Sequence, residues 1–266
     1  DPHQWDSAPL TLVGHRQRAE DVHVGCFVLH TERLRCAEPA GQMDDCVHVD
    51  EVDAHLVGVA HIQRRVEGHR VIAARLDLAA CYRIFDHLGW SESIYNHISL
   101  KVPGEEDTFL INPFGLLYDE VTASNLGKID VEGNNVGPSQ YMVNKAGFTQ
   151  HAYFHKHLGQ RADAICHVHT TATMAVCSHE GGLMPTNFYA CNFIGQIGYH
   201  DFEGVTVREE EGPRLLNALG DKTILMLKNH GPVVMGKSLP EAFIKYWALQ
   251  RACEQRQARR GSAGRS

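Results

Sequence analysis

The sequence predicts an α/β fold in which a mixed β-sheet carries helices on its faces. Strand-like and helix-like apolar patterns alternate along the chain after residue 71. Two short apolar segments early in this region read as a hairpin, which adds antiparallel strands to the sheet. Hydrophobic residues make up 43% of the chain and charged residues 21%, as is typical of a globular protein.

The first half of the patterned region begins with a helix. Residues 71–88 carry an apolar stripe, and Gly89 follows as a C-terminal cap. The elements predicted next, in chain order, are a strand at 94–102, a strand at 109–111, one or two helical turns at 122–126, a strand at 128–131 and a helix at 148–158.

The second half ends in a long helix. Its predicted elements, in chain order, are a strand at 164–169, a helix at 171–178, strands at 223–227 and 232–235, and a helix at 239–257. Cys81, Cys166 and Cys177 lie within apolar stretches, which favours small buried side chains in a reducing compartment over disulfides.

The two ends of the chain differ from the region between them. Residues 1–70 contain seven arginines, eight histidines and no lysine, and they show no sustained period. We expect this extension to stand apart from the folded domain, which we place at 71–257. It is either a divergent, disordered extension or a mis-annotated, mis-extended reading frame. Residues 258–266 are polar and predict a disordered tail.

Charge and hydropathy exclude several classes of partner. A net charge of −7 gives no reason to expect a nucleic acid. No apolar run reaches the roughly 18 to 20 residues that a membrane helix needs, and no signal peptide is visible. We therefore expect a cytoplasmic protein that acts on a small molecule.

The strongest chemical signal is His167-Val168-His169 at the end of a predicted strand. Residues two apart on a strand point to the same face, so both imidazoles project together. His230 follows another apolar strand, and Gly231 lets the backbone approach closely. Three histidines leave positions open for substrate, as in catalytic zinc sites. Imidazole also accepts Mn²⁺ or Fe²⁺.

A second group of histidines competes with this one. His151, His155 and His157 lie on one predicted helix, and the first two share a face. Without a carboxylate or a third ligand nearby, we interpret them mainly as surface or packing residues.

Several ordered motifs between residues 72 and 256 resemble the class II aldolase/adducin family. They are the His-Val-His strand, the Asn-His-Gly turn at 229–231, Asp77-Leu78-Ala79-Ala80, Gly89-Trp90, Asn96-His97-Ile98-Ser99, Asn112-Pro113-Phe114-Gly115-Leu116-Leu117 and Tyr199-His200-Asp201.

The resemblance implies a three-layer α/β/α fold with a mixed, largely antiparallel sheet. It also implies a zinc-like ion on His167, His169 and His230, and a homotetramer with its active site between subunits. Substrate-binding positions carried over from the family are Asn96, Ser99 and Gly115. Tyr189 lies close to the family tyrosine that acts from a neighbouring subunit.

The chain departs from the family's sugar-phosphate aldolases at their catalytic glutamate. Those enzymes have a Ser-Ser-Glu run where this chain has Lys145-Ala146-Gly147. The departure removes a proton-shuttling carboxylate and two phosphate-binding hydroxyls, and Phe114 replaces a small hydroxyl residue in the other phosphate loop. The Ala146-to-His151 stretch instead matches the adducin-type and decarboxylase-like members.

These observations predict a divalent-metal-dependent carbon–carbon lyase, of aldolase or decarboxylase type. It would act through a metal-stabilised enolate on a small, carboxylate-bearing substrate. Catalytic candidates are Tyr189, His200 as proton donor or orienter, and His151 as general base. Two alternatives stay open: a non-catalytic adducin-like binding module of the cytoskeletal, actin-associated type, and a sugar-phosphate aldolase or epimerase.

Overall fold

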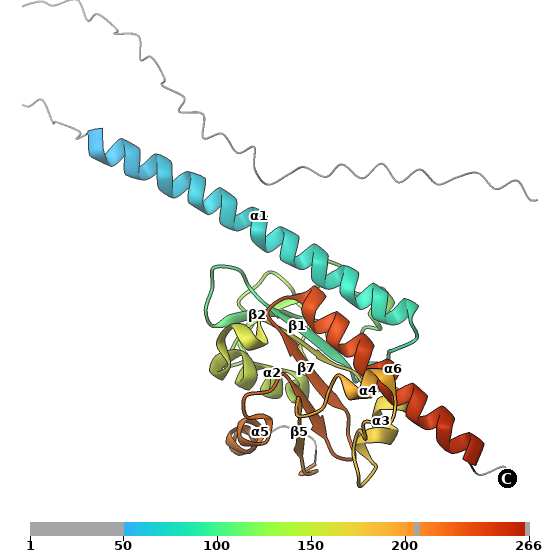
Figure 1. Ribbon diagram of the computed structural model, residues 1–266. Coiled ribbons are helices and arrows are strands. Elements are labelled where there is room, and N and C mark those ends of the chain that lie inside the picture. Colours follow the sequence, from blue (N-terminus) through green and yellow to red (C-terminus); the bar gives the residue numbers. More distant parts are fainter. Residues whose placement is uncertain (1–50, 205–207, 264–266) are drawn as a thin grey trace, which may run out of the picture. The chain divides into compact units, whose positions relative to one another are not determined.

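The structure is a computed structural model that describes residues 51–204 and 208–263; side chains are described in these ranges except at 51–67, 209 and 259–263. The chain divides into two units, Asp1–Val49 and Asp50–Ser266. Only the second contains described residues, and the fold below is that of this unit (Figure 1). The predicted extension therefore lies outside the described residues up to position 50.

One seven-stranded sheet forms the centre of the unit, in the order β3-β2-β1-β4-β7-β6-β5. Neighbouring strands are antiparallel except β5 and β6, which are parallel. This confirms the predicted mixed, largely antiparallel sheet. The strands are β1 (His97–Lys101), β2 (Thr108–Ile111), β3 (Gly127–Asp130), β4 (Ala164–His167), β5 (Ile197–His200), β6 (Ile224–Leu227) and β7 (Pro232–Gly236).

Helices cover both faces of the sheet and complete the three layers. Side chains alternate across a strand, so Ala164 and Cys166 of β4 join the core under one set of helices, and Ile165 joins the core on the opposite face. The first face carries α1 (Glu51–His87), α3 (Thr171–Cys177), α4 (Phe188–Cys191) and α6 (Leu239–Ala263); the second carries α2 (Lys145–His157) and α5 (Gly212–Leu219).

Helix boundaries account for most differences from the sequence prediction. Helix α1 begins at Glu51, well before the predicted start, and α6 continues to Ala263 beyond the predicted end. Both extra segments are polar enough to hide a helical period. Helix α2 begins at Lys145 because the side chain of Asn144 caps it by accepting from Ala146 N.

One predicted element is replaced by a turn, and three others were not predicted. Residues 123–125 form a turn instead of a helix, closed by reciprocal hydrogen bonds between Thr122 and Asn125. The unpredicted elements are α4, β5 and α5. The first has four residues, and β5 contains Gly198, so neither offers a clear period.

A buried tyrosine joins α1 to the strands that carry the site. Tyr82 Oη receives the backbone N–H groups of Ile98 and Asn112 at 3.0 and 3.1 Å. The Asn112 side chain in turn donates to Asn96 O at 3.3 Å. These bonds fix the start of β1, where Asn96 and His97 lie. Cys81, Cys166 and Cys177 are buried free thiols, as predicted.

Candidate metal centre

Three histidines meet at one edge of the sheet. His167 is the last residue of β4, His169 follows two positions later, and His230 lies in the loop between β6 and β7. Because β4 and β7 are antiparallel neighbours, the end of one lies beside the start of the other. Each histidine offers a ligand atom, and these atoms all lie within 4.8 Å of one another.

Hydrogen bonds orient the rings so that their free nitrogens converge. His167 Nδ1 donates to Pro232 O at 3.0 Å, which leaves the Nε2 lone pair directed at His169 Nε2, 3.0 Å away. Asn96 Oδ1 accepts from His169 N at 2.8 Å. A Cβ at Gly231 would lie 2.8 Å from His169 Cδ2, so the glycine permits this close approach, as predicted.

Burial keeps these rings in the state that binds metal. It lowers the pKa of His167 well below 6.5, and the neighbouring His169 and His230 lower it further. Burial also lowers the pKa of His169 to about 3 and that of His230 below its ordinary value. Neutral imidazoles with converging lone pairs are the donor set that zinc and related divalent ions take. The residues present therefore fit the implied ion.

His97 is a neighbour of this centre that the sequence analysis did not single out. It pairs with His167 across β1 and β4, and the two ring centroids lie 6.4 Å apart. A Cβ at Gly147 would lie 2.5 Å from His97 Cγ. The imidazole of His97 thus fills the space next to the position where the aldolases carry glutamate. Burial lowers the pKa of His97 to about 4.

His151 lies in the same buried region, on α2. Its ring centroid is 6.5 Å from that of His167 and 6.1 Å from that of His97. Its Nε2 is buried and has no hydrogen-bond partner among the described residues. Burial is the largest cause that lowers the pKa of His151 well below 6.5. The neutral ring therefore offers a lone pair at neutral pH.

The three predicted substrate-binding residues have different surroundings. Asn96 is fully buried beside His169, and its Nδ2 has no hydrogen-bond partner among the described residues. Ser99 is also buried, but its Oγ is engaged by His151 Nδ1 at 2.6 Å and His155 Nε2 at 2.7 Å. Gly115 lies in an exposed turn at a φ of 92°, next to the exposed ring of Phe114. Of the three, Asn96 keeps a free polar group at the centre.

Tyr189 does not contact the three histidines within this chain. It lies on α4, on the opposite face of the sheet from His167, and its ring packs against Phe188 and Trp247. A role for Tyr189 at the centre therefore requires a second subunit.

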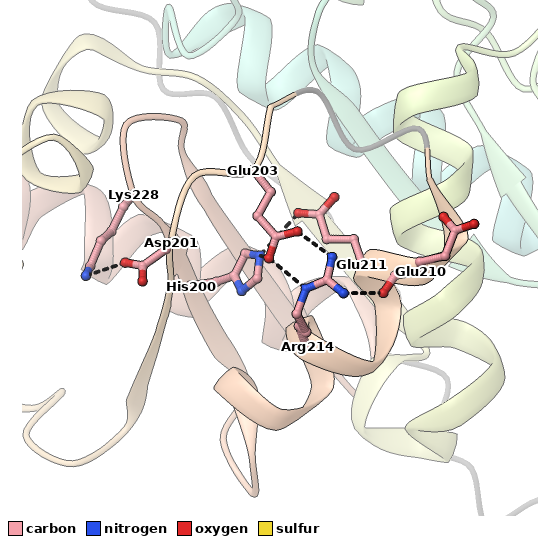
Figure 2. Close-up of polar contacts among 7 residues, drawn as sticks. All are labelled: His200, Asp201, Glu203, Glu210, Glu211, Arg214 and Lys228. Atoms are coloured by element: carbon pink, nitrogen blue, oxygen red, sulfur yellow. Dashed lines mark hydrogen bonds and ion pairs between the residues drawn. The ribbon is translucent and has the colours of Figure 1, made fainter.

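His200, the remaining catalytic candidate, belongs to a separate ionic cluster at the end of β5 (Figure 2). Its Nε2 lies 3.2 Å from Glu211 Oε1 and 3.6 Å from Glu203 Oε1. Arg214 donates to both carboxylate oxygens of Glu203. Lys228 pairs with Asp201 at 2.6 Å. These three residues, His200, Glu203 and Glu211, form the second group with metal-ligand spacing among the described residues.

Comparison with known proteins places this geometry in a family. The model of the class II aldolase and adducin N-terminal domain matches residues 76–256. The chain belongs to this family. A Caulobacter vibrioides protein whose name places it among the class 2 aldolases is 42% identical over 184 residues, which cover 68% of this chain and 70% of that protein. Rat alpha-adducin is 45% identical over 195 residues, which cover 71% of this chain and 26% of alpha-adducin.

Solved structures support the same assignment. An aldolase II superfamily protein from Pseudomonas syringae is 38% identical with a TM-score of 0.70, covering 73% of this chain and 78% of that chain. An L-fuculose 1-phosphate aldolase from Glaciozyma antarctica is 28% identical with a TM-score of 0.65, covering 73% and 75%. The family thus contains both aldolases and adducins. Among the described residues, no helix is long and apolar enough to cross a membrane.

Proposed function

We propose that this class II aldolase family member is a divalent-metal-dependent carbon–carbon lyase. The observation that carries the proposal is the convergence of three neutral imidazoles, whose ligand atoms lie within 4.8 Å of one another. A divalent ion held by His167, His169 and His230 would supply Lewis-acid stabilisation for the enolate left by bond cleavage. Zinc suits this donor set, and Mn²⁺ and Fe²⁺ are alternatives.

The surrounding residues bind and orient the substrate in this proposal. Asn96 Nδ2 is a buried donor without a partner, and such a group is costly unless a ligand satisfies it. It would donate to a substrate oxygen. His151 Nε2 is the matching buried acceptor and would receive a substrate hydroxyl. The buried position of both groups excludes bulk water from the reacting atoms.

The surroundings favour a carboxylate-bearing substrate over a sugar phosphate. A phosphate needs several convergent donors, often at a helix N-terminus. At the N-terminus of α2, however, Asn144 already accepts from Ala146 N at 3.1 Å. Gly147 supplies no carboxylate, and His97 fills the adjoining space. The second phosphate loop presents Phe114, which is 40% exposed.

A side-by-side assay of the metal-loaded protein tests the proposal. One set of substrates comprises small hydroxy- and oxo-carboxylates, and the other L-fuculose 1-phosphate and related sugar phosphates. We expect turnover in the first set and background rates in the second, and no turnover with His167→Ala. Turnover of a sugar phosphate alone would overturn the carboxylate assignment and restore the aldolase alternative.

A non-catalytic binding module is the second candidate, because the chain is 45% identical to alpha-adducin over the shared region. Metal analysis separates the two. A lyase of this type needs about one ion per chain, whereas a binding module has no such need. Absence of metal from the purified protein and failure to take it up would favour the binding module.

We also propose a homo-oligomer, with a tetramer as the expected state. The support within this chain is an exposed apolar group on and beside α4, where the Phe188 ring is 77% exposed and Ile194 66% exposed. Association through this face would place Tyr189 near a neighbouring subunit. Light scattering at micromolar concentration tests it, and a monomer would leave Tyr189 without a role in catalysis.

A further inference from the structure

A chain of three hydrogen bonds connects a backbone carbonyl to the imidazole of His151. His155 Nδ1 lies 2.6 Å from Ala162 O, and His155 Nε2 lies 2.7 Å from Ser99 Oγ. Ser99 Oγ lies 2.6 Å from His151 Nδ1. Ser99 and both histidines are at most 1% exposed, so water does not compete for these bonds. The chain therefore has a fixed set of partners.

The carbonyl at one end sets the direction of every proton in this chain. A carbonyl oxygen only accepts, so His155 Nδ1 must carry a hydrogen. Burial lowers the pKa of His155 to about 3, so the ring is neutral and its Nε2 is an acceptor. The single hydroxyl proton of Ser99 then goes to His155 Nε2. Ser99 Oγ is left to accept, and His151 Nδ1 must supply the proton.

We propose that Ser99 and His155 are positioning residues that hold His151 in its Nδ1–H tautomer and leave Nε2 as an unprotonated acceptor at the centre. The neighbouring rings are those of His167 and His97. Nε2 is buried without a partner among the described residues, as expected for an acceptor that waits for a ligand. The role of Ser99 is thus to orient His151, in place of the predicted substrate contact.

The tautomer determines which ligand group His151 can meet. A lone pair accepts a hydroxyl proton and repels a carboxylate oxygen. Resting on the proposed lyase function, this means that the substrate turns a hydroxyl toward His151 and its carboxylate elsewhere. The opposite tautomer would present an N–H and reverse this preference. Ser99 and His155 would therefore decide substrate orientation without touching the substrate.

Long-range ¹H–¹⁵N correlation spectra of the ¹⁵N-histidine-labelled full chain test the assignment. In the metal-free protein at pH 7, we expect Nδ1–H and a bare Nε2 for both His151 and His155. Ser99→Ala should shift His151 toward the Nε2–H tautomer, while Ser99→Thr, which keeps the hydroxyl, should restore Nδ1–H. His157→Gln, at an exposed position on the same helix, is the matched control and should leave both signals unchanged.

The spectrum of the unaltered chain decides the matter even if a variant fails to fold. A protonated Nε2 on His151 in that spectrum would overturn the proposal, as would an unchanged His151 tautomer in folded Ser99→Ala. The measurement needs no substrate, so failure of the lyase assignment leaves it intact. If the lyase assignment holds, Ser99→Ala should lower kcat by about 10²-fold with unchanged metal content, because a positioned proton acceptor is typically worth about 10²–10⁴-fold.

Discussion

Two groups of potential metal ligands lie at the ends of strands in the same sheet, and their hydrogen bonds set them apart. At the end of β4, His167 donates through Nδ1 to a backbone carbonyl, so its Nε2 presents a lone pair. At the end of β5, His200 Nε2 lies 3.2 Å from a carboxylate oxygen of Glu211. A carboxylate only accepts, so that nitrogen carries a proton and has no lone pair to offer.

The comparison shows that ligand spacing alone does not define a metal site. The carboxylates of the His200 cluster already have cationic or N–H partners: Arg214 binds Glu203, and His200 binds Glu211. The histidine centre has no charge of either sign to satisfy its lone pairs. A divalent ion would complete the first group and would have to break ion pairs in the second. We therefore assign the ion to His167, His169 and His230.

The largest expected effect separates the two groups directly. His167→Ala should reduce bound zinc from about one ion per chain to background, because two imidazoles hold an ion poorly. His200→Ala removes another buried histidine at the end of a strand and should retain about one ion. Elemental analysis after dialysis against zinc measures both. Loss of zinc in His200→Ala with retention in His167→Ala would reverse our assignment.

Acid should destabilise the histidine-rich side of the comparison next. Burial lowers the pKa of His97 to about 4 and of His155 to about 3. The unfolded chain takes up these protons near pH 6.5, before the folded chain does, so stability falls as pH drops from about 6.5 to 4. Each group contributes about 1.4 kcal/mol per pH unit within that window. At pH above 6.5 the effect disappears.

Urea unfolding of the metal-free protein at pH 7, 6 and 5 measures this slope. His155→Gln should reduce the slope by about 1.4 kcal/mol per pH unit, since one titrating group is removed. His157→Gln, which changes an exposed histidine on α2, serves as the control. An unchanged slope in His155→Gln would show that His155 is protonated in the folded state at these pH values.

The same contrast shows what the sequence could and could not predict. Strand alternation brought His167 and His169 to one face, and family motifs added His230, because these depend on local pattern. The role of His97 depends on the β1–β4 register, which pairs it with a residue 70 positions away. Ser99 was assigned to substrate because its two partners, His151 and His155, lie on a distant helix.

An intermediate effect is expected where His97 and Gly147 meet. Gly147→Ala should destabilise the fold by about 1–3 kcal/mol, because the new Cβ lies within 3 Å of the His97 ring atoms. His97→Ala should relieve that cost, so a double-mutant cycle should show coupling of opposite sign. Gly147→Glu should behave similarly and add a carboxylate near the centre only in the His97→Ala background. Additive effects in the cycle would mean that the two positions do not compete for space.

The smallest effect is expected in the outer part of the His200 cluster. Arg214 and Glu203 form an ion pair whose side chains are 53% and 32% exposed, and water and salt screen such pairs. Arg214→Ala should therefore leave the urea midpoint unchanged within error. It would also leave the Glu203 carboxylate without its cation, next to His200 and Glu211, which is the condition under which this cluster could compete for an ion. Zinc titration of Arg214→Ala at pH 7 measures this: a stoichiometry that stays at about one ion per chain supports the assignment to the three histidines, whereas a second bound ion would show that Arg214 is what keeps metal out of the cluster.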